Sequence, residues 1–147
     1  NDYNIINMDV GALNLVESKE LFNNLPTYKS DKFTGVAEVY LNNISELGEQ
    51  SFQFCGNLER FPFNECKNVT TFHKEAFAHA GIQSITLYTQ QIHPETFKNT
   101  NPNRVYIRGN PTFSAEFIEM LQDATVFAAP NSNYMELCHY GVLVRPL

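Results

Sequence analysis

The chain has 147 residues, about the length of one domain, and 43% of them are hydrophobic, which is enough for one core. Its formal net charge of −6 argues against a basic groove for nucleic acid and against an anionic membrane as a partner. No stretch approaches the roughly 20 apolar residues that cross a bilayer, so no membrane span is predicted. Because the sequence starts at Asn1 and shows no targeting signal, we expect any such signal to have been removed.

The first 35 residues lie outside the repeat pattern that follows them. Residues 1–13 are rich in Asn with little periodicity, so we expect them to be irregular or partly disordered. Residues 14–25 predict a short amphipathic helix, because Asn14 and Glu17 have capping-box spacing and Pro26 marks its end. We expect this helix to cover the open end of the first repeat, since terminal repeats need a cap.

Residues 36–130 repeat one pattern of apolar and small residues. Each unit opens with apolar residues in the order apolar-x-x-apolar-x-apolar, as in Leu58, Phe61 and Phe63. The units begin at Val36, Leu58, Ile82 and Pro102, so the period is about 20 to 24 residues, which is the mark of a solenoid. We therefore expect a short strand at each opening block and a turn or 3₁₀ turn later in each unit.

One aromatic residue recurs in the second half of the units, at Phe52, Phe77, Phe97 and, in the divergent fourth unit, Phe117. A single unit cannot bury its own apolar edge, but stacked units can, because equivalent residues then lie about 4.8 Å apart. We expect these four rings to form an internal aromatic spine. The alternative is that the periodicity arose by chance in an apolar chain. This is disfavoured because several equivalent positions agree in residue type over three units.

The fourth unit and the tail predict two short helices. Ser114 can cap a helix over residues 115–122, in which Phe117, Met120 and Leu121 share one face. A strand is expected at residues 124–129. The tail then reads as a short helix stopped at Gly141 and a last extended piece.

The order of these slots resembles the BspA-like (Treponema-type) leucine-rich repeat, with the best match at residues 44–55, ISELGEQSFQFC. The resemblance covers roughly residues 36–130. It implies an α/β fold, namely a right-handed solenoid with short parallel strands and few helices, an N-terminal helical cap within residues 1–35 and a C-terminal cap at residues 131–147. Because this family occurs mainly in bacterial surface proteins and in some protozoan parasites, the resemblance also implies a cell-surface or secreted protein. Local departures, such as the longer second unit, affect the shape of single coils.

Alternation within each opening block directs the spacer residues outward. One outward column holds Glu38, Arg60, Ser84, Arg104 and Thr125, and the next holds Tyr40, Pro62, Thr86, Tyr106 and Phe127. Aromatic and arginine side chains dominate the energy of protein interfaces. The candidate partner-binding residues are the outward aromatic and arginine side chains Tyr40, Arg60, Arg104, Tyr106, Arg108 and Phe127. A second interpretation stays open, because strands favour aromatic residues in any case, and an ion pair between Glu38 and Arg60 would stabilise the sheet only weakly.

The sequence contains no G-x-S-x-G, H-E-x-x-H, G-x-x-x-x-G-K-[ST] or G-x-G-x-x-G motif, so we expect neither an enzyme nor a cofactor. His73 and His93 share a repeat slot and could hold a divalent metal, but only two ligands are assured, and no metal site is predicted. Cys55 and Cys66 could pair in an oxidising compartment. The simpler interpretation of Cys55 is a small buried hydrophobe.

Two functions from different classes fit these observations. The first is a non-enzymatic cell-surface module, an adhesin or protein-interaction domain, that binds a protein or other extracellular macromolecule of a host or neighbouring cell through its outward strand face. The alternative is a structural spacer or capping segment of a larger surface protein with no ligand of its own. An enzyme would need a deep pocket, for which so few coils leave little room. The sequence leaves the ligand and the oligomeric state open.

Overall fold

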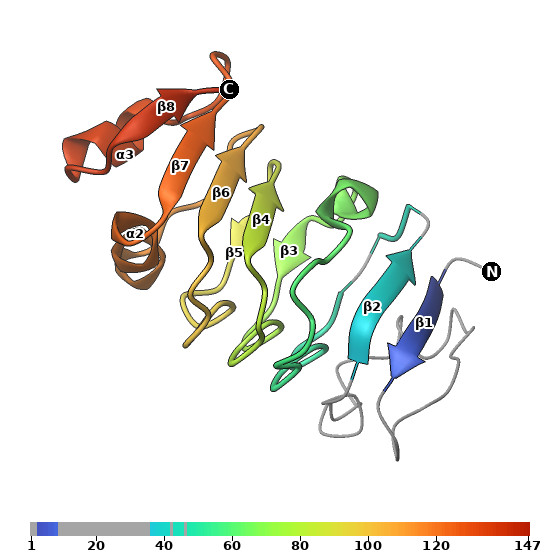
Figure 1. Ribbon diagram of the computed structural model, residues 1–147. Coiled ribbons are helices and arrows are strands. Elements are labelled where there is room, and N and C mark those ends of the chain that lie inside the picture. Colours follow the sequence, from blue (N-terminus) through green and yellow to red (C-terminus); the bar gives the residue numbers. More distant parts are fainter. Residues whose placement is uncertain (1–2, 9–35, 42, 46) are drawn as a thin grey trace.

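The computed structural model describes residues 3–8, 36–41, 43–45 and 47–147, and the side chains of residues 3–8, 36–38 and 40 lie outside that description. Its elements follow one another along a row of coils (Figure 1). In chain order they are β1 (Tyr3–Met8), β2 (Val36–Leu41), the 3₁₀ helix η3 (Phe63–Cys66), β3 (Thr71–Phe72), β4 (Ser84–Leu87), β5 (Gln91–Ile92), β6 (Arg104–Ile107), α2 (Ala115–Gln122), β7 (Thr125–Ala128), α3 (Met135–His139) and β8 (Val144–Pro146).

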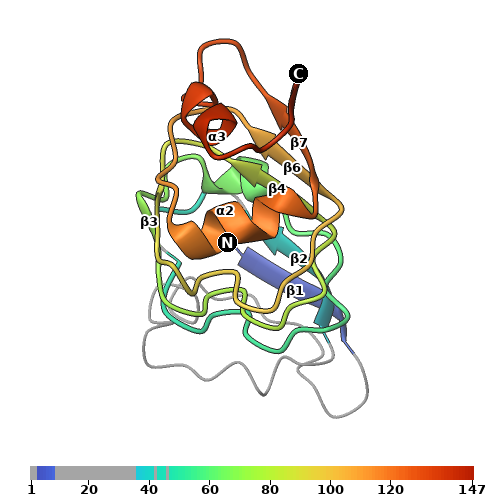
Figure 2. The same ribbon diagram turned by 90° about the vertical axis from the view of Figure 1, so that its left-hand side faces the viewer.

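Strands β4, β6, β7 and β8 form a parallel sheet in that order, so each strand pairs with the next one in the repeat series. A second parallel pair, β3 with β5, lies on the other side of the coils (Figure 2). The described part is therefore a mixed α/β arrangement with parallel strands and few helices, as the sequence predicts.

Burial alternates along the strands of the four-stranded sheet. In β6 the branched side chains of Val105 and Ile107 are fully buried, whereas Arg104 and Tyr106 face outward. Strands β4 and β7 show the same two-residue period. Branched residues pack well on a pleated surface, and this alternation decides which side chains can meet a partner.

The predicted aromatic spine is confirmed. Consecutive rings of Phe52, Phe77, Phe97 and Phe117 stack with centroids 6.0, 5.4 and 5.8 Å apart. Each ring comes from a different repeat, and all four side chains are buried. The interior of one coil is thus continuous with that of the next, which is why a single unit would not be stable alone.

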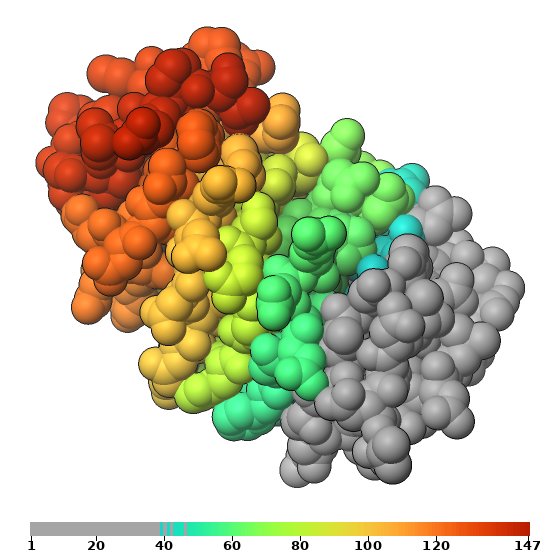
Figure 3. Space-filling model, viewed as in Figure 1, coloured from blue at the N-terminus to red at the C-terminus, as the bar shows by residue number. Residues whose placement is uncertain are grey.

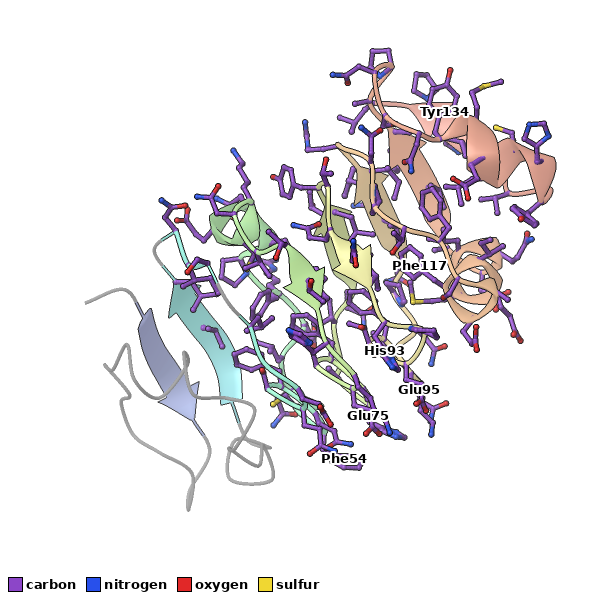
Figure 4. The ribbon with its side chains drawn as sticks, turned by 180° about the vertical axis from the view of Figure 1, so that it is seen from behind. Phe54, Glu75, His93, Glu95, Phe117 and Tyr134 are labelled. Atoms are coloured by element: carbon purple, nitrogen blue, oxygen red, sulfur yellow. The ribbon has the colours of Figure 1, made fainter. Side chains whose placement is uncertain are left out.

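The turns that carry these rings are joined by backbone hydrogen bonds. The N–H of Phe52 donates to the carbonyl of Ala76 at 2.7 Å, and the N–H of Phe77 donates to that of Thr96 at 2.9 Å. We call the stacked turns, residues 50–55, 74–80 and 94–100, the turn ladder. Phe54, His79 and Asn99 take equivalent places in it with positive φ angles of 62°, 58° and 55°. Figure 4 shows Phe54, Glu75, His93 and Glu95 along this edge of the molecule.

The helices predicted for the fourth unit and the tail are both present. The hydroxyl oxygen of Ser114 accepts a hydrogen bond from the N–H of Phe117 at 3.1 Å, which caps α2. In α2 the buried side chains are Phe117, Ile118 and Leu121, and Met120 is partly buried against the core. Helix α3 ends before Gly141, whose φ of 80° is one that glycine adopts readily.

The first residues differ from the expectation. Residues Tyr3–Met8 are not irregular but form β1, which pairs antiparallel with β2. Aromatic and β-branched residues in this segment favour a strand despite its Asn content. The predicted strand at Val36 is present as β2, although β1 is its only partner among the described residues. The helix expected over residues 14–25 lies outside the described residues.

The second unit also differs, because its opening block is not a strand. Pro62 occupies the slot that Thr86 and Tyr106 fill in later units. Proline has no N–H to donate to the preceding strand, so the ladder is interrupted there. The chain turns into η3 directly afterwards.

Candidate functional site

The outward side chains of β4, β6, β7 and β8, with the residues that directly continue these strands, form what we call the strand face. Its columns follow the predicted order: Ser84, Arg104 and Thr125 are in register, and so are Thr86, Tyr106, Phe127 and Arg145. Figure 3 shows successive repeats running side by side as bands across the molecule in this view. Neighbouring positions in a column are separated by one strand spacing, about 4.8 Å, so their side chains are close enough to contact one partner together.

Two aromatic residues lie at the centre of the strand face. The rings of Tyr106 and Phe127 stack with centroids 5.2 Å apart and an angle of 16° between their planes. Both side chains are half-buried, so each leaves part of its surface open to solvent. The pair forms a flat apolar surface fixed on two neighbouring strands, and such surfaces are common anchors of protein interfaces.

Arginines flank the aromatic pair. Arg104 is the first residue of β6, Arg108 directly follows its last residue, and Arg145 lies beside Phe127 on β8; all three are exposed. Within the described residues none of them forms an ion pair. The four strands contain no Asp or Glu, so the strand face is positively charged although the whole chain is acidic.

The other two predicted residues lie apart from this group. Arg60 is exposed on the coil before β4, next to Glu59, whose carbonyl accepts the N–H of Gln83 at 2.9 Å. Tyr40 belongs to β2, and its side chain lies outside the described residues. The structure therefore brings together Arg104, Tyr106, Arg108 and Phe127 of the six candidates.

The sequence pattern missed two features of this face. Arg145 joins the column of Phe127 because the last extended segment pairs with β7, and the alternation of Val142 and Val144 was the available signal. The ammonium of Lys67 also lies 5.6 Å from the ring centroid of Tyr88. Burial raises the pKa of the Tyr88 hydroxyl, and the positive charge of Arg108 offsets part of this shift.

The candidate metal and thiol groups are placed as follows. The ring nitrogen Nδ1 of His93 accepts the N–H of Glu95 at 3.0 Å, so it already has a partner. Within the part of the chain that the structure describes, no group of three or more metal-binding side chains lies together. Cys55 and Cys66 are buried free thiols, and Cys138 is exposed. Burial raises the pKa of the Cys55 thiol to about 12 and raises that of Cys66 as well.

Comparisons with known proteins agree with the repeat pattern. The family described as the BspA type leucine rich repeat region matches residues 14–116 with six copies, which is more than half of the chain. This match begins before the first repeat recognised in the sequence, at Val36. No curated protein and no solved structure matches the chain. Among the described residues, no helix has the length and apolar character to cross a membrane. The chain belongs to the BspA-type leucine-rich-repeat family.

Proposed function

We propose that this chain is a non-enzymatic protein-binding module of a cell surface, and that its strand face contacts the partner. Leucine-rich-repeat domains mediate protein interactions and are typically non-enzymatic, and the BspA type is associated with bacterial surface proteins. The observation that carries the proposal is the stacked pair of Tyr106 and Phe127 between exposed arginines. An adhesin role, with a partner on a host or neighbouring cell, follows from that surface location.

The scaffold supports this proposal because it holds the anchors rigidly. Val105, Ile107 and Val126, which alternate with the outward residues, are fully buried. Tyr106 and Phe127 therefore have few conformations to lose when a partner binds. Preorganisation of this kind lowers the entropic cost of association.

The charge of the strand face indicates the chemistry of the partner. Arg104, Arg108 and Arg145 are exposed and have no ion-pair partner within the described residues. A guanidinium group can bind a carboxylate with two parallel hydrogen bonds. We propose that the partner presents acidic side chains around an apolar centre.

We also propose how the chain is divided. A right-handed solenoid spans residues 36–130, an N-terminal cap lies within residues 1–35, and a C-terminal cap spans residues 131–147. Leu137 and Val142 of the tail are buried against the core, which supports the last of these. Pro146 also supports it. The N–H of Leu147 donates to the carbonyl of Ala128 in β7 at 3.1 Å. Since successive backbone nitrogens of a strand point to opposite sides, the nitrogen of Pro146 points away from β7. Proline has no N–H there, which discourages pairing with a further strand.

The test is a binding panel of purified extracellular-matrix and cell-surface proteins, measured by surface plasmon resonance. We expect at least one of them to bind, and we expect the double variant Tyr106→Ala with Arg104→Ala to weaken that binding by about tenfold or more. Lys98→Ala is the control, because it removes an exposed charge on the turn ladder, away from the strand face, and should leave binding unchanged. If the double variant binds with the same affinity as the unmodified protein, the strand face does not contact the partner.

A second candidate function is the structural spacer or capping segment of a larger surface protein. One observation favours it: large apolar side chains are exposed at the C-terminal end, namely Met135, Tyr140, Leu143 and Leu147. Leu143 is 74% exposed. Exposed apolar groups gathered in one region mark contact surfaces. A spacer would bind no protein of the panel, so the same experiment separates the two functions.

A further inference from the structure

The turn ladder ends in two backbone N–H groups that have no acceptor among the described residues. In the first turn the N–H groups of Phe52 and Phe54 donate to the carbonyls of Ala76 and Ala78, and that of Gln50 donates to Lys74. In the second turn the N–H groups of Phe77 and His79 donate to the carbonyls of Thr96 and Lys98. In the third turn the equivalent donors are Phe97 and Asn99, and no described residue accepts from either. The fourth unit has helix α2 where the next turn would lie.

A cavity of about 420 Å³ takes the place of that missing turn. Phe97 and Asn99 line it on one side, and Phe117 and Met120 of α2 line it on the other. Figure 2 shows α2 crossing the end of the coils, and Figure 4 shows His93 and Glu95 at the neighbouring turn edge. Because the donors in the earlier turns point along the ladder to the next turn, those of Phe97 and Asn99 point towards this cavity. Its volume lies within the range of about 300 to 1,000 Å³ that is usual for ligand sites.

The charges around the cavity are mostly negative. Glu116, Glu119 and Asp123 of α2 line it, and none of them forms an ion pair with a described residue. Lys98 also lines it, but its ammonium is 3.7 Å from the carboxylate of Glu95. The cavity therefore combines two unpaired backbone donors, an apolar wall and unpaired carboxylates.

We propose that this cavity binds a short cationic peptide segment of a partner protein. Two peptide carbonyls, two residues apart, accept the N–H groups of Phe97 and Asn99, as the carbonyls of Thr96 and Lys98 do for the preceding turn. The edge of the ladder is thus extended by one more strand-like segment, which is a recurrent mode of peptide recognition.

A lysine or arginine of the same segment supplies the complementary charge. Its aliphatic stem packs on Phe117 and Met120, and its cation lies among the carboxylates of α2. This site is separate from the strand face, whose arginines repel a cationic peptide. The inference therefore does not depend on the proposed function.

The test is an NMR titration of the ¹⁵N-labelled protein with a blocked pentapeptide that alternates alanine and lysine. We expect the amide signals of Phe97 and Asn99 to shift most and to saturate, and the shifts to shrink at high salt because exposed charges are screened. The same peptide with glutamate in place of lysine should produce no such shifts. Saturating shifts with both peptides, or shifts confined to other residues, would overturn the proposal.

Two variants test the charge contribution. Glu119→Gln combined with Asp123→Asn should weaken peptide binding several-fold, whereas Glu136→Gln on α3, which removes a charge outside the cavity, should leave it unchanged. Free lysine amide, which lacks the pair of spaced carbonyls, should not shift Phe97 and Asn99 together. If the carboxylate variant binds the lysine peptide as well as the unmodified protein does, the proposed occupant is wrong.

Discussion

The ring of Tyr106 lies on the ring of Phe127, 5.2 Å away between centroids, although 20 residues separate them along the chain. The two residues meet because β6 and β7 pair in a register that places them directly opposite each other. Because the two residues are one repeat apart, they form a single surface although they are distant in the sequence. The proposed function depends on this relationship.

The stack should be measurable as a coupling energy. We expect the free energies of unfolding of Tyr106→Ala, Phe127→Ala and the double variant to be non-additive by about 0.5 to 1.5 kcal/mol, the usual strength of an aromatic pair. Urea unfolding of the four proteins provides the measurement. Strictly additive effects would show that the rings do not stabilise each other.

Phe77 should be the most costly spine residue to truncate. Its ring stacks on Phe52 on one side and on Phe97 on the other, and it is fully buried. We expect Phe77→Ala to lower the free energy of unfolding by about 3 to 5 kcal/mol, because it leaves a cavity in a packed core. Phe54→Ala is the matched control, since its ring is 48% exposed, and urea unfolding should show a much smaller loss.

Gly81 permits a close approach between two coils. A Cβ atom at this position would lie 2.1 Å from the carbonyl oxygen of Gly56, so the backbone would have to move. We expect Gly81→Ala to destabilise the fold by about 1 to 3 kcal/mol or more through overpacking. Gly56→Ala is the control, because a Cβ there meets nothing within 4 Å and its melting temperature should stay close to that of the unmodified protein.

The three thiols should differ in reactivity. Cys138 is exposed, whereas Cys55 and Cys66 are buried with raised pKa values, and the thiolate is the reactive form. We expect a chromogenic disulfide reagent to modify one thiol in the native protein and three in denaturant. Rapid modification of three thiols without denaturant would contradict the burial of Cys55 and Cys66.

The same burial gives a dependence of stability on pH. The pKa of Cys55 is raised from 9.0 to about 12, so above about pH 9 the unfolded chain loses a proton that the folded chain keeps. The free energy of unfolding should therefore fall as pH rises from about 9 towards 12. The measurement is the difference from Cys55→Ala, whose free energy of unfolding should fall less steeply as pH rises above about 9.

The repeated slots allowed the parallel strands, the aromatic spine and the outward columns to be predicted, because stacking brings equivalent residues such as Phe77 and Phe97 together. They did not allow β1 to be predicted, since strand pairing with β2 outweighed the weak pattern of residues 3–8. The loss of the second strand followed from one proline, Pro62, in a slot that requires an N–H. The cavity beside α2 could not be predicted, because unpaired donors are recognised only when the whole hydrogen-bond ladder is known.

The most direct measurement is hydroxyl-radical footprinting of the complex with the panel protein that binds most tightly. We expect binding to lower the oxidation rates of Tyr106 and Phe127, which lie on the strand face, and to leave that of Phe54 on the turn ladder unchanged. Protection of Phe54 with no change at Tyr106 and Phe127 would place the partner on another side of the molecule and would contradict the account.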